Sequence, residues 1–228
     1  MKHSNLKQVL FLLLLFFPLL GFAHGVSSSD QELLTNGGLL AYIRVGATHM
    51  LTGYDHLLFL AGVIFYLTGF KDILKFITVF TIGHCITLIF ATYAGITANE
   101  HLVDAVIAIS VLYKGFENLG GFEKLNVKSP DLLLMVGIFG LIHGFGLSTR
   151  LQSFDMGADQ FLAKILCFNL GVEIGQVLAL IPIVFVLTLS RKHKQFPTFY
   201  KAVNWFLVLA GIGLFLFQMY GYFFGHGH

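Results

Sequence analysis

The stretch GATHMLTGYDHLLFL, residues 46–60, places His49, Asp55 and His56 at the start of a long apolar segment. Ionisable side chains are costly in hydrocarbon, so a cluster of them at such a place indicates a functional site. Three later apolar segments each add one more group of this kind. We therefore predict one polar, metal-binding site inside a helical membrane protein, formed by His49, Asp55, His56, His84, His143 and Glu173.

The composition indicates that the solvent of this chain is lipid. Of its 228 residues 56% are hydrophobic and only 11% are charged, whereas soluble domains carry about 25% charged residues. The formal charge of +2 argues against nucleic acid as a partner. Cys85 and Cys167 both fall within apolar segments and form no CxxC pair, so we interpret them as small core residues.

The N-terminal residues 1–23 have the pattern of a secretory signal peptide. Lys2 and Lys7 precede an apolar core, and Gly21-Phe22-Ala23 gives a small-x-small cleavage site. An uncleaved first membrane helix is the alternative, but the apolar run is short for a span. We predict three parts: a signal peptide (1–23), an external N-terminal segment (24–38) and a helical membrane domain (39–228).

Six transmembrane helices are expected after the signal peptide, because spans need about 20 largely apolar residues. The mixed segment over 39–52 fits a short re-entrant or interfacial helix better than a full span. The fold class is therefore all-α and polytopic, since open sheets do not occur in lipid. The expected spans cover residues 55–69, 74–96, 102–121, 131–151, 161–189 and 200–223.

The distribution of basic residues between the spans predicts the orientation. The loops after spans one, three and five are rich in lysine and arginine, which makes them cytoplasmic and puts both mature termini outside. A cleaved signal peptide requires the same side for the N-terminus. We expect a multi-pass protein of the inner (cytoplasmic) membrane, with these cytoplasmic basic residues: Lys71, Lys75, Lys124, Lys128, Arg191, Lys192, Lys194 and Lys201.

The spacing of His49 and His56 raises a geometric question. Seven residues on a straight helix separate two side chains by about 10.5 Å along the axis, too far for both to bind one ion at about 2 Å. A helix break at residues 52–54, around Gly53, would fold His49 back towards Asp55 and His56. Without a break, the two histidines would be successive stations on a path. Asp55 could fix the tautomer of an imidazole or simply cap a helix.

Two later segments carry the other candidate ligands. In the second span, Thr78, Thr81 and His84 are three residues apart and share a helix face. In the fourth, His143 is surrounded by four glycines, which suits either tight helix packing or an ion held against the backbone.

The remaining polar residues of the spans are candidate supporting residues. Asn169, Glu173 and Gln176 form one stripe on the fifth span, where Glu173 has no cation three or four residues away. On the third span, Asp104 could line an outer entrance. Lys114 and Glu117 could pair, either as a structural feature or as a cytoplasmic-side gate. We take the supporting residues to be Thr81, Asn169, Gln176, Asp104, Glu117 and Asn118.

Together these motifs resemble the HupE/UreJ family of membrane proteins, in its second branch. His49 to His56 has the H-x5-D-H form, and the GxxHxxxGxDHLLFL, TxFTxxHxxTL, EN, HGFG and FNxGVExGQ pieces recur along residues 39–180. The resemblance implies six helices after a signal peptide and the passage of nickel or cobalt. The chain departs from the nickel-uptake branch in having only His143-Gly144 where that branch has two His-Gly steps and a following glutamate.

Two functions fit these residues. The first is a secondary permease for a divalent transition-metal ion, since imidazoles with a few carboxylates suit nickel, cobalt, zinc or copper(II) better than magnesium or calcium. No nucleotide-binding loop is present, so ATP is not the driver unless a partner brings it. The alternative is an intramembrane zinc hydrolase, although there is no HExxH motif. The expected partners are the metal ion and the lipid bilayer, and self-association is left open.

Overall fold

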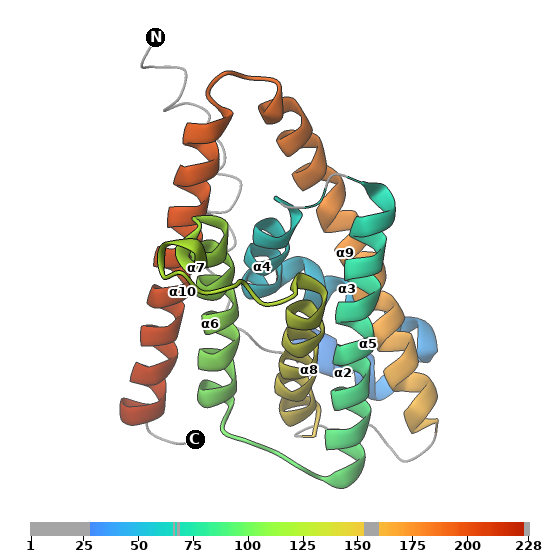
Figure 1. Ribbon diagram of the computed structural model, residues 1–228. Helices are drawn as coiled ribbons and strands as arrows, with labels where there is room; N and C mark the ends of the chain where they lie inside the picture. Colours follow the sequence, from blue (N-terminus) through green and yellow to red (C-terminus); the bar gives the residue numbers. More distant parts are fainter. Residues whose placement is uncertain (1–27, 66, 68, 153–159, 226–228) are drawn as a thin grey trace.

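The computed structural model describes residues 28–65, 67, 69–152 and 160–225, and within these ranges it contains helices and connections but no strand. The predicted signal peptide lies outside the described residues. Figure 1 shows an elongated bundle in which α5, α6, α8 and α10 run side by side. The described helices are α2 (Ser28–Asn36), α3 (Leu39–Thr52), α4 (Tyr54–Ile64), α5 (Phe70–Ala94), α6 (Glu100–Asn118), α7 (Gly121–Lys124), α8 (Leu132–Leu151), α9 (Phe161–Arg191) and α10 (Phe196–Phe224).

Four of these helices, α5, α8, α9 and α10, are long and apolar enough to cross a membrane. Helix α6 has 19 residues but carries Glu100, Asp104, Lys114 and Glu117. Helix α4 has only 11 residues, a rise of about 16 Å against the roughly 30 Å of a bilayer core. The spans expected at 55–69 and 102–121 therefore stay predictions, as does the re-entrant character of residues 39–52.

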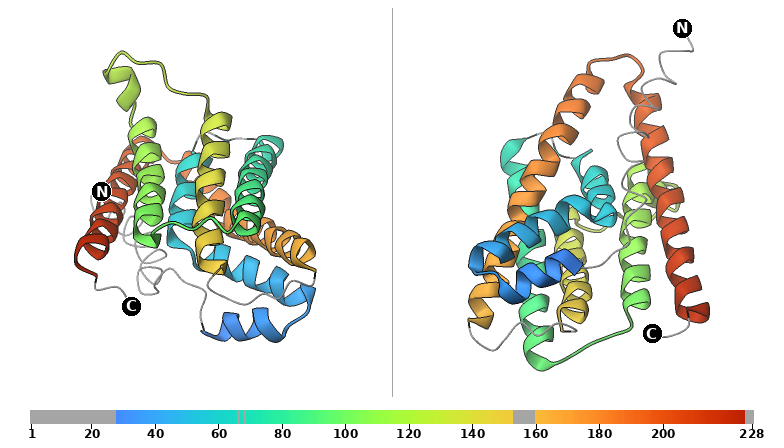
Figure 2. Two further views of the ribbon diagram at one scale, coloured as in Figure 1. Left: turned by 90° about the horizontal axis from the view of Figure 1, so that it is seen from below. Right: turned by 180° about the vertical axis from the view of Figure 1, so that it is seen from behind.

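The helix break expected at residues 52–54 is present. Helix α3 ends at Thr52 and α4 begins at Tyr54, with Gly53 between them at φ −70° and ψ 98°, an extended conformation. Figure 2 shows α3 lying obliquely to the bundle, with α4 continuing upward from its end. The break places Asp55 and His56 in the first turn of α4.

Glycines bring the helices together in pairs. Helix α3 packs on α9, α5 on α8, and α6 on α10. A Cβ at Gly46 would overlap the carbonyl oxygen of Phe168, and one at Gly171 would overlap that of Ile43. Small residues allow membrane helices to approach this closely. The glycines around His143 have the same role, because a Cβ at Gly140 would meet the carbonyl of Phe80.

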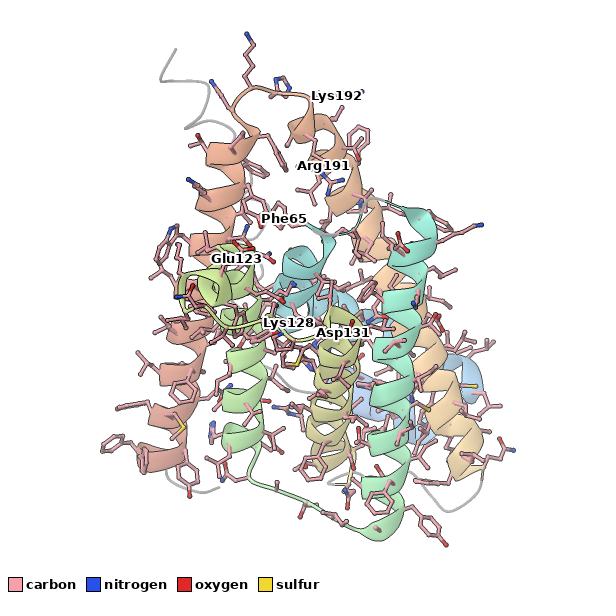
Figure 3. All side chains as sticks on the ribbon, viewed as in Figure 1. Phe65, Glu123, Lys128, Asp131, Arg191 and Lys192 are labelled. Carbon is pink, nitrogen blue, oxygen red and sulfur yellow. The ribbon has the colours of Figure 1, made fainter. Side chains whose placement is uncertain are left out.

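The turn after α4 is held by a distant residue. Arg191, at the end of α9, donates hydrogen bonds from Nη2 to the carbonyls of Phe65 (3.2 Å) and Leu67 (3.3 Å). Figure 3 shows Arg191, Lys192 and Phe65 in the same half of the bundle. The turn between α9 and α10 lies at this end, whereas the connection from α5 to α6 and the end of α10 lie at the other.

The outward faces of the long helices are apolar. Leu170, Phe185, Leu209 and Phe217 are between 50% and 65% exposed. Such a surface is too apolar for water but suits lipid chains, as expected for a multi-pass membrane protein.

Candidate metal centre

The candidate metal centre consists of Asp55, His56 and His143. Asp55 and His56 lie at the start of α4, and His143 lies within α8. Each offers one ligand atom, and these atoms all lie within 4.8 Å of one another. All three residues are at most 5% exposed. Ligands about 2.0–2.1 Å from one tetrahedral ion are about 3.4 Å apart, so small side-chain movements would let an ion bind all three.

Hydrogen bonds define which nitrogen of each buried imidazole carries the proton. His56 Nδ1 lies 2.9 Å from Asp55 Oδ1, and His143 Nδ1 lies 2.7 Å from the carbonyl oxygen of Phe139. A carbonyl oxygen accepts but never donates, and so does an ionised carboxylate. Both Nδ1 atoms are therefore donors. A neutral imidazole that donates from Nδ1 presents a lone pair at Nε2, which is the arrangement of metal-binding histidines with an oriented ring.

His84 has the same arrangement. Its Nδ1 lies 2.8 Å from Asn169 Oδ1, while Asn169 Nδ2 donates to the carbonyl of Ile165 at 2.9 Å. The second bond assigns the amide nitrogen, so Asn169 Oδ1 is the acceptor and His84 Nδ1 the donor. The supporting residue Asn169 is thus placed directly behind a predicted ligand.

The three Nε2 atoms are the outstanding feature of this region. Those of His56, His84 and His143 are all buried and have no hydrogen-bond partner among the described residues. Most buried side-chain polar atoms in proteins are hydrogen-bonded, and an unmet one costs about 1–3 kcal/mol. Three unmet lone pairs of the same kind indicate a ligand, and a cation would satisfy them.

His49 lies next to this group. Its ring centroid is 5.2 Å from that of His56, in an edge arrangement, and 5.9 Å from that of Phe168. The break at Gly53 produces this contact across seven residues of chain. His49 is half-buried and sits beside the group rather than within it.

His84 is close to the group but is separated from it by an aromatic ring. It is fully buried and is not among the residues whose ligand atoms cluster. The ring of Phe80 stacks on that of His84, with centroids 6.3 Å apart, and meets that of His143 edge-on at 5.2 Å. The structure therefore brings His56 and His143 together and leaves His84 one ring away.

Glu173 and the two other polar residues of this stretch join α5 to α9. Glu173 is half-buried and accepts a long hydrogen bond of 3.5 Å from Thr78. Thr81 donates to Gln176 at 3.0 Å. These contacts make Thr81 and Gln176 part of the wall, whereas Glu173 does not reach the Asp55–His56–His143 group.

Asp104 is engaged in an ion pair. Arg150 Nη2 lies 2.5 Å from Asp104 Oδ2, which also accepts from Gln218 at 3.1 Å. Asp104 is 6% exposed and Arg150 8%. The suggested outer entrance is thus closed in this structure by a contact that ties α6 to α8 and α10. The sequence did not single out Arg150, because its partner is 46 positions away.

Lys114 and Glu117 form the ion pair that their spacing suggested, with 2.5 Å between Nζ and Oε2. Glu117 also accepts from Ser129, and Asn118 donates to the carbonyl of Gly62 (2.9 Å) and to Asn204 (2.6 Å). These bonds join α6 to α4, to α10 and to the α7–α8 connection, away from the histidines. Glu117 and Asn118 thus support the helices rather than the candidate centre.

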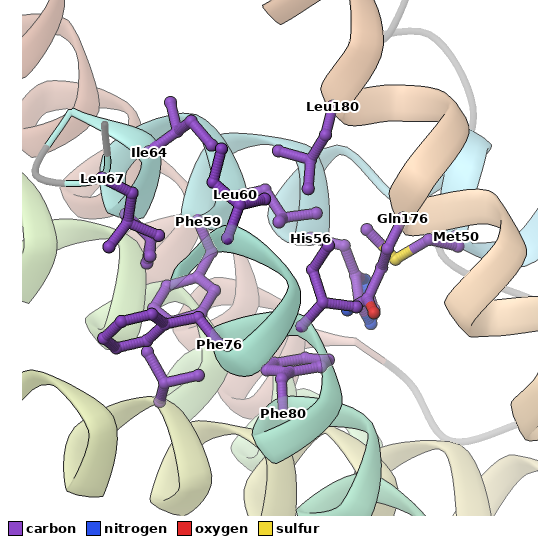
Figure 4. Close-up of a pocket in the computed structure, with 14 residues that line it drawn as sticks. Met50, His56, Phe59, Leu60, Ile64, Leu67, Phe76, Phe80, Gln176 and Leu180 are labelled. Atoms are coloured by element: carbon purple, nitrogen blue, oxygen red, sulfur yellow. The ribbon is translucent and has the colours of Figure 1, made fainter. Parts of the chain in front are cut away.

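A narrow apolar cavity extends from the candidate centre. His56, Met50, Phe80 and Gln176 line one part of it, and Figure 4 shows Ile64 and Leu67 in another. Sequence reasoning missed Phe80 as a site residue, although its position four residues before His84 places both on one helix face.

Fold and site together define a multi-pass helical membrane protein with a buried histidine–carboxylate group. Comparison with known families gives the particular assignment: the family model described as HupE / UreJ protein matches residues 27–226. The chain belongs to the HupE/UreJ family. Searches of curated proteins and of solved structures returned no significant match.

Proposed function

We propose that this protein is a secondary transporter, or permease, for a divalent transition-metal ion. The observation that carries the proposal is the set of three buried imidazoles whose Nε2 atoms lack a partner, two of them clustered with a carboxylate. A buried cation would satisfy these lone pairs, and Asp55 would offset part of its charge. Family membership supports this proposal, because the HupE/UreJ family is associated with nickel and cobalt transport.

The donor set defines the kind of ion. Neutral imidazole nitrogens suit nickel, cobalt, zinc and copper(II), whereas magnesium and calcium prefer sites made of oxygen. Nickel and cobalt are favoured by the family association. His49, Asp55, His56 and His143 would hold the ion first, and His84 would lie further along its path. Glu173, at the half-buried edge of α9, would attract the cation rather than bind it in this state.

We further propose the membrane arrangement that the sequence suggested, with one refinement. Six segments cross the inner membrane after a cleaved signal peptide, and the first crossing is divided into an oblique outer part, α3, and a short inner part, α4. Lys71, Lys75, Arg191 and Lys192 then face the cytoplasm, and the end of α10 faces outside. The divided crossing supports ion binding because discontinuous helices place polar groups at mid-membrane.

Uptake by reconstituted protein tests the proposal. Purified protein in liposomes should accumulate radioactive nickel or cobalt above the level of protein-free liposomes. His143→Ala removes one of the clustered ligands and should reduce uptake to that background. His193→Ala is the matched control, because His193 is exposed in the turn before α10 and should leave uptake unchanged. Wild-type protein that accumulates neither metal, or a His143→Ala variant equal to the wild type, would contradict the proposal.

The apolar cavity beside His56 favours one alternative, an intramembrane zinc hydrolase. Zinc held by histidines and a carboxylate can activate water, and an acyl chain could occupy an apolar cavity. Zinc-loaded protein that releases fatty acid from membrane lipids, and that loses this activity in His143→Ala without supporting uptake in the wild type, would favour the hydrolase.

A further inference from the structure

Phe80 occupies a special position between the candidate ligands. Its ring contacts those of three histidines: His84 by stacking at 6.3 Å, and His143 and His56 edge-on at 5.2 and 6.2 Å. Phe80 is 3% exposed. The Asp55–His56–His143 group and His84 are therefore two separate positions for an ion, with one aromatic side chain packed against both.

The lone pairs on both sides of this ring are available. The Nε2 atoms of His56 and His143 on one side and of His84 on the other are buried without a hydrogen-bond partner in the described part of the chain. Each imidazole is held from behind through Nδ1. An ion leaving the first group would find a pre-oriented ligand in His84, provided that the Phe80 ring moved aside.

The surroundings leave the ring, rather than the helix, free to move. A Cβ at Gly140 would overlap the backbone carbonyl of Phe80, and one at Gly83 would approach that of Gly137. Helices α5 and α8 are thus in backbone contact on either side of Phe80 and cannot slide without clashes. The cavity, in contrast, is lined by Phe80 itself and offers space for a changed rotamer (Figure 4). Rotamer changes of a single side chain need far less rearrangement than a helix shift.

We propose that Phe80 is the internal gate of this protein and controls the transfer of the metal ion from the Asp55–His56–His143 group to His84. The inference rests on the proposed permease function and deepens it by naming the residue that limits passage. With its ring in place, the ion stays in the first group. When the ring turns into the cavity, the Nε2 atom of His84 becomes the next ligand.

Variants of Phe80 test the gate. Phe80→Leu shortens the side chain and removes the flat ring, so the maximal uptake rate should rise at least threefold. Phe80→Trp enlarges the ring and should lower that rate at least tenfold. In both variants the Kd for Co²⁺, measured by titration of the purified protein, should stay within threefold of the wild-type value, because neither change touches a ligand. The effect should therefore appear in the maximal rate and not in KM.

Two further variants serve as references. Phe59→Leu is the matched control, since the Phe59 ring contacts those of Phe80 (5.9 Å) and His143 (6.1 Å) but belongs to α4, and it should change uptake less than twofold. His84→Ala should keep the Kd for Co²⁺ and abolish uptake, because it removes the second position alone. If His84→Ala also abolished Co²⁺ binding, the two positions would be one site and the gate would be excluded.

The outcomes separate this inference from the proposed function. Wild-type protein without any uptake overturns the permease itself. Uptake by the wild type that Phe80→Trp leaves unchanged overturns the gate alone, as does a Phe59→Leu variant that changes the rate as much as Phe80→Leu. Phe80 variants whose Kd for Co²⁺ weakens more than tenfold would make Phe80 a packing residue of the first group.

Discussion

At the scale of single residues, the candidate centre is defined by what lies behind each imidazole. A carboxylate, an amide oxygen and a backbone carbonyl each accept from an Nδ1 atom of His56, His84 and His143 in turn. The three acceptors differ in chemistry, but they have the same consequence, a fixed ring with its Nε2 lone pair exposed to the interior. Such partners typically change metal affinity or activity by about 10–100-fold when they are removed.

Asn169 provides a direct test of this effect. Asn169→Leu removes the acceptor of His84 Nδ1 and the bond to Ile165, so uptake should fall about 10–100-fold and stability by about 1–3 kcal/mol. Asn169→Asp keeps an acceptor for Nδ1 and should retain most of the uptake. Initial uptake rates and thermal unfolding in detergent measure both effects. An Asn169→Leu variant that transports normally would remove Asn169 from the support of His84.

At the scale of helices, the break between α3 and α4 is the feature on which the centre depends. On one straight helix His49 and His56 would be about 10.5 Å apart along the axis, but their rings are 5.2 Å apart here. Gly53 makes the close turn possible: an added Cβ would lie 2.8 Å from His56 Nδ1 and 3.3 Å from Asp55 Oδ1. Its backbone angles are accessible to other residues, so space rather than conformation requires glycine here.

Gly53→Ala should therefore weaken metal binding. Its methyl group would push His56 away from Asp55, and we expect the Kd for Co²⁺ to rise at least tenfold. Gly38→Ala, before the first residue of α3, is the matched control, because nothing lies within 4 Å of an added Cβ there. Titration of the two purified variants makes the comparison. Equal affinities would show that the turn tolerates a side chain and that the contact between Asp55 and His56 is not needed.

The helices also show what could be inferred from the sequence. The break around Gly53 followed from the spacing of the two histidines, and the Lys114–Glu117 pair followed from helix periodicity. The separation of His84 from the other ligands could not be inferred, because it depends on how far α5 and α8 are shifted along each other. That shift is set by backbone contacts at Gly83 and Gly140 between segments more than 50 residues apart. The pairing of Asp104 with Arg150 is equally non-local.

At the scale of the whole molecule, hydropathy predicted the long spans better than the short ones. Helices α5, α8, α9 and α10 were recognisable because each is uniformly apolar. Helix α4 ends early for a reason outside its own sequence, since Arg191 binds the carbonyls of the turn that follows it. Helix α6 keeps four ionisable residues, and three of them, Asp104, Lys114 and Glu117, are buried in ion pairs with side chains that the chain supplies itself.

The proposed orientation can be tested by labelling. In a variant with Cys85 and Cys167 replaced by serine, Ala98→Cys in the α5–α6 connection should react with a membrane-impermeant maleimide in intact spheroplasts. Lys192→Cys, beyond the end of α9, should react only after permeabilisation. Both residues are exposed in the structure. The opposite labelling pattern would invert the orientation and place the basic loops outside.

The central claim is that a metal ion binds among Asp55, His56 and His143, and metal analysis of the purified protein tests it most directly. Protein equilibrated with nickel or cobalt, freed of excess ion and measured by mass spectrometry should hold close to one ion per chain. His56→Ala and His143→Ala should each lose it, while His193→Ala should keep it. Metal content that is the same in all four proteins would contradict the account.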